Sequence, residues 1–324
     1  MNGAPASSEL QLLLKRGDEF AARGDVKAAV SFYQTALKAA RDARPVEATL
    51  IDHLRRAQSF VMDQARLFQA ALDSSVAGKM PSDSVQALRL SHSLEMLKGQ
   101  RQVYQQQPAV FYYPYLAQRQ FLEREEFDWV DDIEAATDDI REELLALVNE
   151  GANFQPYVQD DPNRPRKEFH GLNDNADWTA LYLWKDGDRV EVNAGCCPRM
   201  MAALQKVPLS RIGSRTPAVL FSRLEPGAHI PPHSGMLNCR LICHLPLIVP
   251  AGCWLRVGNE TREWEEGKLL IFDDSMEHEA KNPTGELRII LLFDVWKPEL
   301  GEEEREAISA IFDSIDRFQG ISEG

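Results

Sequence analysis

Residues 254–272 read WLRVGNETREWEEGKLLIF, and this stretch decides the fold class of the C-terminal part of the chain. Three short apolar or alternating runs are separated by turn dipeptides, Gly258-Asn259 after the first and Glu266-Gly267 after the second. A helix needs an apolar period of 3.6 residues over a longer run, whereas short strands fit between closely spaced turns. The stretch therefore predicts short β-strands.

The same texture extends outward from about residue 178 to residue 295. Turn residues such as Asp186-Gly187 and Pro226-Gly227 continue to interrupt short apolar runs. We expect strands at 179–184, 190–193, 218–224, 237–249, 254–257, 262–264, 269–272 and 288–295. This arrangement predicts an all-β sandwich or barrel and not a parallel α/β sheet. Helices are expected before and after it, at about 129–148 and 302–318, with a polar, proline-rich loop at 156–166.

The first 107 residues have a helical pattern. Small and aromatic residues occur at a spacing typical of one tetratricopeptide repeat, with a turn at Gly24-Asp25: Leu13, Gly17, Phe20, Gly24, Ala29, Tyr33 and Ala36. Segments 47–76 and 83–107 are periodic without the full signature, and Pro81-Ser82-Asp83 indicates a break followed by an N-cap. A generic helical bundle and a peptide-binding repeat module both remain open. We expect domains at 1–107 and 108–324.

Charge and composition exclude several classes of function. The formal net charge of −14 over 324 residues argues against a nucleic-acid partner and against an anionic membrane surface. The five cysteines form no metal-binding pair, and their odd number argues against a disulfide framework. The N-terminus lacks a signal-peptide pattern, and the apolar stretch 241–255 is broken by prolines. We expect a cytoplasmic protein with no membrane partner.

Four of the seven histidines lie in the expected β region: His229, His233, His244 and His278. In a barrel, inward-facing positions of several strands converge on one lumen, and imidazole binds iron, zinc, copper and nickel. A single histidine in such a region is more often a hydrogen-bonded core residue. The histidines alone therefore do not name a metal.

The words around the histidines are more specific. They are SRLEPGAHIPPHSG at 222–235, NCRLICH at 238–244 and EEGKLLIFDDSMEHE at 265–279, followed by a last strand that begins at Arg288. In this order they resemble the catalytic domain of the aspartyl/asparaginyl β-hydroxylases, over roughly residues 115–300. The resemblance implies an α+β chain with a double-stranded β-helix, a cupin-like jelly roll, after an all-α module.

The resemblance also implies an iron(II) site with His233 and His278 as ligands. Most 2-oxoglutarate oxygenases add a carboxylate two residues after the first histidine, but Gly235 stands there in this chain. The family's own two-histidine variant explains that glycine. Asp274 is then expected to hold a metal-bound water in place of the missing ligand.

For the cosubstrate 2-oxoglutarate, the resemblance implies that Arg288 and Ser222 bind the distal carboxylate and that His244 approaches the carboxylate beside the keto group. Relatives usually have an arginine where this chain has Ile242. Arg240 lies on the same face of the expected strand and is either a compensating cation or a structural ion-pair partner. Trp178 is either a wall of the pocket or a core residue.

The implied activity is hydroxylation of an unactivated carbon with iron(II), 2-oxoglutarate and O2. We expect the β-carbon of an Asp or Asn residue in a peptide or protein, and the helical module would suit such a substrate or a protein partner. A free or carrier-bound amino acid is the alternative substrate. A halogenase is less favoured because the whole sequence context resembles hydroxylases, and a zinc or nickel enzyme because of Arg288 and the same resemblance. A non-catalytic adaptor is less favoured because both histidines, Ser222 and Arg288 are present.

Overall fold

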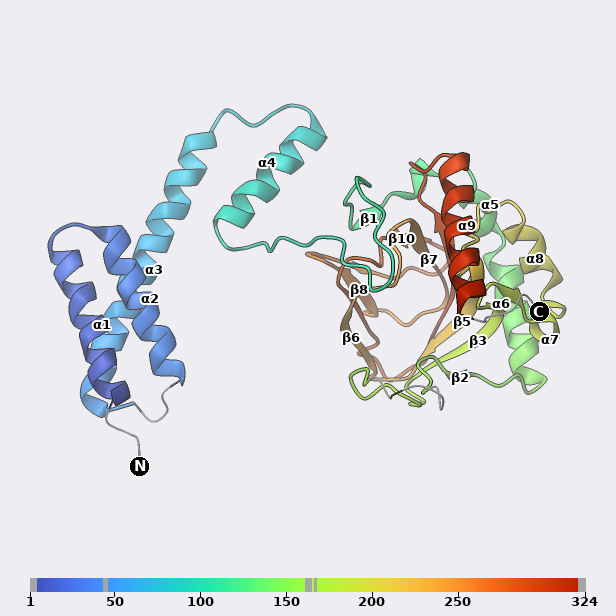
Figure 1. Ribbon diagram of the computed structural model, residues 1–324, viewed down its shortest axis with the longest axis horizontal. Coiled ribbons are helices and arrows are strands. Elements are labelled where there is room, and N and C mark those ends of the chain that lie inside the picture. Colours follow the sequence, from blue (N-terminus) through green and yellow to red (C-terminus); the bar gives the residue numbers. More distant parts are fainter. Residues whose placement is uncertain (1–4, 43–45, 161–164, 166–167, 320–324) are drawn as a thin grey trace. The chain divides into compact units, whose positions relative to one another are not determined.

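The computed structural model describes residues 5–42, 46–160, 165 and 168–319 (Figure 1). The chain divides into two compact units, Met1–Val103 and Tyr104–Gly324, and each is described here by itself. The division thus falls a few residues before the expected boundary at 107. Part of the expected loop 156–166 lies outside the described residues.

The first unit consists of helices, of which α1 (Pro5–Ala22), α2 (Val26–Asp42) and α3 (Ala48–Val76) share one core. Gly24 has a φ of +79° in the turn between α1 and α2, a conformation that glycine adopts without strain. A Cβ at Gly17 would lie 2.4 Å from the Tyr33 ring, so this glycine allows the two helices to pack closely. The spacing of small and aromatic residues therefore correctly predicted two closely packed helices with a turn at Gly24.

The last helix of this unit, α4 (Ser84–Leu97), begins as expected and ends early. Asp83 is its N-cap and accepts a hydrogen bond from the Gln86 amide at 2.9 Å. The expected helix to residue 107 is wrong, because Gly99 adopts a positive φ of 72° directly after the C-cap. None of the residues of α4 is buried.

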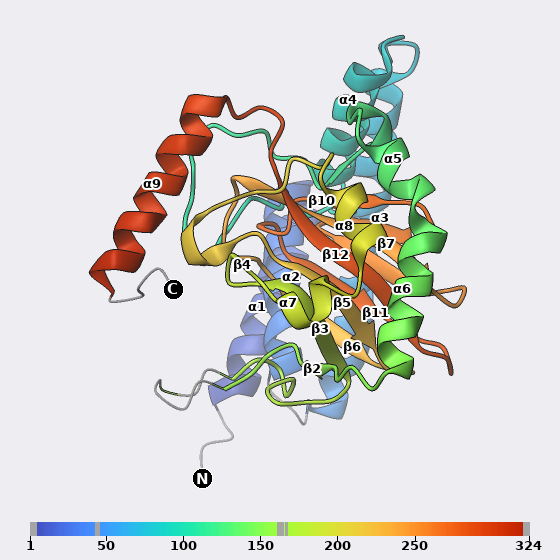
Figure 2. The ribbon, with the colours of Figure 1, turned by 90° about the vertical axis from the view of Figure 1, so that its right-hand side faces the viewer.

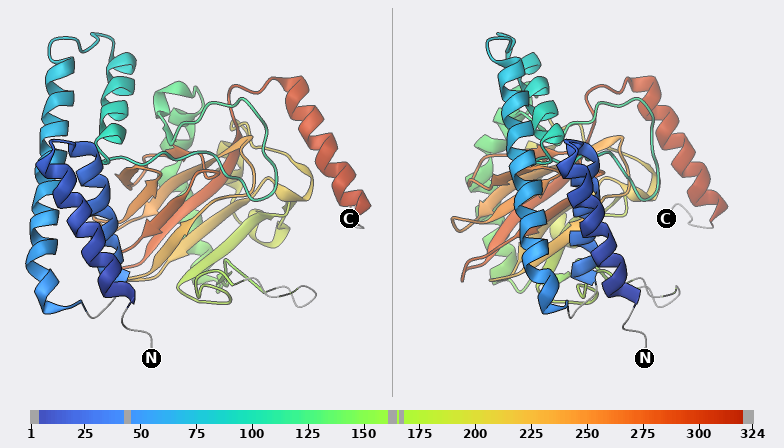
Figure 3. Two further views of the ribbon diagram at one scale, coloured as in Figure 1. Left: turned by 60° about the vertical axis from the view of Figure 1, so that its left-hand side comes forward. Right: turned by 90° about the vertical axis from the view of Figure 1, so that its left-hand side faces the viewer.

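The second unit is built from two antiparallel sheets. The larger sheet has the order β1-β10-β7-β12-β5-β3-β2, with β4 paired to β3, and the smaller has the order β6-β11-β8-β9. Figure 3 shows the strand arrows of this unit from two further sides. Two such sheets facing each other form a double-stranded β-helix, so the chain is α+β as expected. The strand bounds are β1 Phe121–Leu122, β2 Gln155–Pro156, β3 Trp178–Lys185, β4 Asp188–Arg189, β5 Val219–Leu224, β6 His229–His233, β7 Arg240–Ile248, β8 Trp254–Val257, β9 Glu260–Glu263, β10 Leu270–Phe272, β11 His278–Lys281 and β12 Arg288–Trp296.

The central strands β7 and β12 are buried on both faces. Alternate residues such as Leu241, Cys243, Leu291 and Phe293 join the core beneath the helices. The residues between them face the other sheet, as expected for a side-chain period of two. Helices α5 (Val130–Ala135), α6 (Thr137–Asn149) and α8 (Pro198–Leu204) cover the outer face (Figure 2). Because helices cover the outer face and the smaller sheet covers the inner face, polar residues of β7 and β12 that face the pocket are buried.

Three sequence predictions need correction. Residues 190–193 do not form a strand: Val190 is the N-cap of the one-turn helix α7 (Glu191–Ala194), in which the Asn193 side chain donates to the Tyr182 carbonyl at 2.7 Å. The helix expected at 129–148 is two helices that meet at Ala136. Strands β6 and β11 were not expected, because one contains two prolines and the other is polar.

The C-terminal helix α9 (Glu302–Phe318) confirms its expected range. Short 3-10 turns occur at η1 (Arg124–Glu126) and η2 (Gly213–Arg215). In the described residues, no helix combines the length and the apolarity needed to cross a membrane.

Candidate active site

One pocket between the two sheets, of about 260 Å³, brings the predicted site residues together. All eight line it: Trp178, Ser222, His233, Arg240, His244, Asp274, His278 and Arg288. Most of them come from strands that are far apart in the sequence: His233 lies opposite His278 in the smaller sheet, and Arg288 lies opposite Leu224 in the larger sheet.

The pocket is therefore assembled by strand pairing. The smaller sheet supplies His233 and His278, and the larger sheet supplies most of the other side chains. Their roles as ligands of iron and 2-oxoglutarate stay predictions, and the geometry below states what each side chain is able to do.

His233 and His278 lie opposite each other in the β6–β11 pair, with ring centroids 4.1 Å apart. The Nδ1 atom of His233 is 2.8 Å from the Pro231 carbonyl, and that of His278 is 3.0 Å from the Met276 carbonyl. A carbonyl only accepts, so each Nδ1 carries the proton and each Nε2 keeps its lone pair for a metal. Burial lowers the pKa of both imidazoles to about 4, which keeps them neutral at pH 7.

The position of the missing carboxylate is filled by Asp274. A Cβ built on Gly235 would lie 1.9 Å from Asp274 Oδ2, so no larger residue fits there unless this carboxylate moves. Asp274 Oδ1 is buried without a hydrogen-bond partner in the described residues, and it is able to accept from a metal-bound water. Within those residues, no group of three or more His, Cys, Asp or Glu side chains is placed to hold a metal. The donor set fits a two-histidine iron site.

Arg288 is a buried cation without a matching anion. Its side chain is 1% exposed, and its nearest polar contacts are the Ser222 carbonyl and Oγ, 3.4 and 3.5 Å from Nη1. Nε has no hydrogen-bond partner, and burial lowers the pKa of the guanidinium to about 9. Burying an unpaired charge is costly, so the site has a strong preference for a carboxylate here. The distal carboxylate of 2-oxoglutarate fits that demand.

The other predicted cosubstrate residues lie close to Arg288. His244 Nδ1 is buried without a partner in the described chain, and burial holds the pKa of this imidazole well below its usual range. Trp178 Nε1 donates to Ser222 Oγ at 3.1 Å, and its ring stacks on Tyr157 with centroids 3.9 Å apart. Trp178 is thus both a buried residue and a wall of the pocket.

Arg240 is held by two carboxylates. Its Nη2 donates to Asp274 Oδ2 at 3.1 Å, and its Nη1 lies 3.7 Å from Asp294 Oδ2. This geometry favours the ion-pair interpretation of Arg240 over that of a cation reserved for 2-oxoglutarate. Ile242 lines the same pocket, as the alternation along β7 predicts.

Four residues in or near the site differ from the sequence interpretation or were absent from it. His229 does not converge on the pocket with the other three histidines: it lies exposed on β6, where Nε2 is 2.8 Å from Glu279 Oε2. Asp294 had no role assigned, although an aspartate inside the apolar run of β12 is an available signal. Tyr157 and Phe169 also line the pocket, and nothing in their local sequence predicts it.

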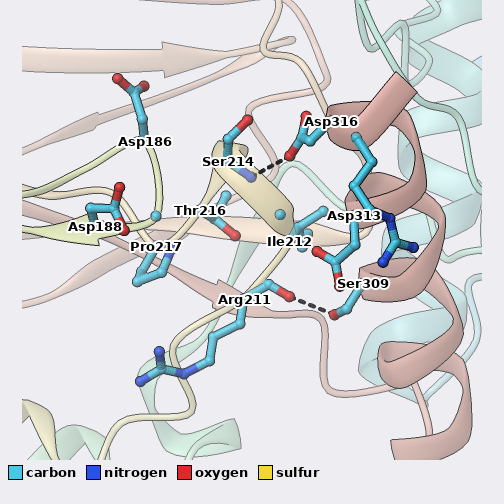
Figure 4. Close-up of a pocket in the computed structure, with 13 residues that line it drawn as sticks. Asp186, Asp188, Arg211, Ile212, Ser214, Thr216, Pro217, Ser309, Asp313 and Asp316 are labelled. Atoms are coloured by element: carbon cyan, nitrogen blue, oxygen red, sulfur yellow. Dashed lines mark hydrogen bonds between the residues drawn. The ribbon is translucent and has the colours of Figure 1, made fainter. Parts of the chain in front are cut away.

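A second pocket, of about 380 Å³, lies between α9 and the β3–β4 turn (Figure 4). Its polar groups largely bind one another: Ser309 Oγ donates to the Arg211 carbonyl at 2.6 Å, and Asp316 accepts from the Ser214 amide at 2.7 Å. It contains no histidine or cysteine among its lining residues. This pocket is larger than the histidine pocket, but its polar side chains bind other groups of the chain. The histidine pocket is therefore the candidate active site.

Comparison with known proteins agrees with this choice. A family model described as aspartyl/asparaginyl beta-hydroxylase matches residues 134–298, which is more than half of the chain. The human protein named aspartyl/asparaginyl beta-hydroxylase is 39% identical over 173 residues, covering 53% of this chain and 21% of that protein. The ornithine lipid ester-linked acyl 2-hydroxylase of Rhizobium tropici is 38% identical over 178 residues, covering 53% of this chain and 58% of that protein.

The chain thus spans less than two thirds of the length of either relative. A solved prolyl-4-hydroxylase of Pseudomonas putida is 12% identical with a TM-score of 0.32, covering 52% of this chain and 99% of that one, and a score this low adds nothing to the fold derived from strand order. The matched segment contains both pocket histidines, His233 and His278, and both pocket arginines, Arg240 and Arg288. By this match, the chain belongs to the aspartyl/asparaginyl β-hydroxylase family.

Proposed function

We propose that the protein is an iron(II)- and 2-oxoglutarate-dependent hydroxylase that acts on an Asp or Asn residue of a peptide or protein. The observation that carries the proposal is one pocket holding two neutral histidines with Nε2 lone pairs and, opposite them, a buried arginine without a carboxylate partner in the described residues. A metal would bind the two Nε2 lone pairs, and a dicarboxylate such as 2-oxoglutarate would pair with the arginine.

Bound iron would supply the activation of O2 that allows an unactivated carbon to be hydroxylated, with 2-oxoglutarate converted to succinate and CO2. The chain's own side chains bind, orient and exclude water. His233 and His278 hold the metal, Arg288 with Ser222 fixes the distal carboxylate, and His244 offers a hydrogen bond at the other end. Trp178 and Tyr157 form a stacked apolar wall that limits the access of water.

The substrate class is supported by the relatives. One is named for aspartyl and asparaginyl residues and the other for an acyl chain of ornithine lipid, so both are named for hydroxylation. The helical unit favours the polypeptide substrate, because its exposed apolar residues, including Leu67 and Phe68, lie beside a groove of α2 and α3. We infer that this unit binds the substrate or a partner protein, and that the protein works in the cytoplasm.

The test is a titration of the full-length protein with manganese(II) in place of iron, followed by 2-oxoglutarate. We expect one metal per chain, metal-dependent 2-oxoglutarate binding, and succinate formation when iron(II), O2 and fractionated cell extract are added. Mass spectrometry should then find a product heavier by one oxygen. Metal binding without any effect of 2-oxoglutarate would instead favour a zinc or nickel enzyme.

A further inference from the structure

The buried charges of the second unit are almost fully paired. Among the residues that the structure describes, three buried cations occur: Arg240, Arg288 and Lys297. Lys297 lies 2.7 Å from Asp273. Arg240 contacts both Asp274 and Asp294. Arg288 alone has no carboxylate within ion-pair distance in the described chain, and the proposed function assigns it to 2-oxoglutarate.

The formal charges around the pocket then sum to zero before any substrate enters. Arg240 and Arg288 balance Asp274 and Asp294, and the two positive charges of iron(II) balance the two negative charges of 2-oxoglutarate. The histidines are neutral. Arg240 and its two carboxylates, Asp274 and Asp294, together carry one excess negative charge. Arg288 does not offset this charge locally, because the proposed function assigns it to the distal carboxylate of 2-oxoglutarate. A further anion in the pocket would remain buried without an unpaired cation among the residues that the structure describes, which is costly.

Among the lining residues that the structure describes, Arg240 and Arg288 are the cations. Ile242 occupies the inner face of β7 between Arg240 and His244, and Ile230 and Leu292 lie in the same apolar cluster. All three are buried and apolar. An acidic side chain at this wall would therefore meet Asp274, hydrocarbon and Arg240, and the charge of Arg240 is already offset by two carboxylates.

The unpartnered atoms at the wall match an amide. Arg240 Nε and Nη1 are donors, and Asp274 Oδ1 is an acceptor, and none of them has a hydrogen-bond partner in the described residues. An amide presents both a carbonyl oxygen and an N–H group, so it is able to meet the donors and the acceptor. A carboxylate presents acceptors only. Asp274 Oδ1 has a second lone pair, so a metal-bound water does not exclude the amide.

We propose that the pocket selects an uncharged side chain, and that asparagine is its substrate residue in preference to aspartate. The inference rests on the proposed function, since the charge balance requires iron and 2-oxoglutarate in the pocket. It makes Ile242 a specificity-determining residue: a cation at this position would supply the missing charge for an aspartate.

The experiment compares two pools of randomised peptides that differ only in a central Asn or Asp. Full-length protein is immobilised with zinc(II) and 2-oxoglutarate, which bind without turnover, and the retained peptides are quantified by mass spectrometry. We expect at least about tenfold greater retention of the Asn pool, because an unpaired buried charge is unfavourable. Ile242→Arg should lower that ratio at least about fivefold. Exposed Ser314→Arg on α9 adds the same charge outside the pocket and should leave the ratio unchanged.

Each outcome decides the inference. Equal or greater retention of the Asp pool overturns it, and so does an Ile242→Arg ratio equal to that of Ser314→Arg. Retention of neither pool by protein that binds zinc and 2-oxoglutarate overturns the asparagine assignment and leaves the cosubstrate site standing. Loss of the proposed function is seen separately, as failure of 2-oxoglutarate to bind in a metal-dependent manner.

Discussion

The two sheets hold their functional side chains in different ways. In the smaller sheet, His233 and His278 are oriented locally, since each imidazole binds a carbonyl two residues earlier in the chain. In the larger sheet, Arg240 and Arg288 are buried on the inner face. Arg240 contacts carboxylates that are distant in the sequence, and Arg288 has no carboxylate partner in the described residues. The smaller sheet is thus specialised for geometry and the larger sheet for charge. Changes in the two sheets should accordingly affect different ligands.

The largest effect is expected in the smaller sheet. His233→Ala or His278→Ala should reduce manganese(II) affinity by more than about 100-fold, because each removes half of the protein ligands and not merely a supporting partner. Circular dichroism should show an unchanged fold. His229→Ala, on the exposed end of the same strand, is the matched control and should bind metal normally. Undiminished metal binding by either pocket variant would contradict the division between the sheets.

Arg288→Ala tests the larger sheet. Loss of the buried guanidinium should weaken 2-oxoglutarate binding by roughly 30-fold or more, which corresponds to about 2–5 kcal/mol for one partner of a buried pair. Metal affinity should change little, since Arg288 is not a ligand. Arg288→Lys keeps the charge and loses the two-pronged contact, so it should fall between wild type and alanine. Calorimetric titration measures all three, and an unchanged 2-oxoglutarate affinity in the alanine variant would place the cosubstrate elsewhere.

Gly235 connects the two sheets through Asp274. Gly235→Ala would push the carboxylate away from Arg240, which should lower the unfolding free energy by about 1–3 kcal/mol and weaken metal binding. Gly285→Ala is a suitable control, because no atom lies within 4 Å of its added Cβ. Gly235→Asp should also damage the site. A gain in turnover from the aspartate would mean that the missing ligand is a defect.

Asp294 gives the larger sheet a distinct pH dependence. Burial raises the pKa of this carboxyl to about 6 against an ordinary value of 3.8, despite Arg240 and the Ala218 amide. Its contribution to stability is therefore fully present below pH 3.8 and is lost as the pH rises through 6. Asp294→Asn should remove that loss, which is on the order of 3 kcal/mol over the whole titration. Denaturant unfolding at pH 5 and pH 8 measures it, and an identical pH response in both proteins would argue against a buried ionised Asp294.

The smallest effect is expected for Ile242→Arg on 2-oxoglutarate binding. A new cation beside His244 should tighten binding by less than about tenfold, or not at all if Arg240 already serves that carboxylate. The same substitution in an Arg240→Ala background separates the two cases by calorimetry. If Arg240→Ala alone weakened 2-oxoglutarate binding more than Arg288→Ala, the cosubstrate would be bound in the opposite orientation.

Sequence alone predicted the larger sheet better than the smaller one. β7 and β12 were expected because they are almost continuously apolar, and they are so because both of their faces are covered. β6 contains Pro231 and Pro232 and β11 reads HEAK, so neither has the composition of a strand. The family resemblance nevertheless pointed to the histidines on both. The pairing of Arg240 with Asp294 depends on a contact between strands that no local pattern encodes.

The placement of one histidine on each of two paired strands has a consequence for folding. His233 and His278 are far apart in sequence and face each other in the β6–β11 register. A metal held by both would act as a reversible cross-link between them, and it would bind only the chain in which this register has formed. Added metal should therefore slow amide hydrogen exchange in β6 and β11 more than in β7 and β12. Metal binding would then indicate that β6 and β11 have paired in the correct register, in addition to serving the reaction.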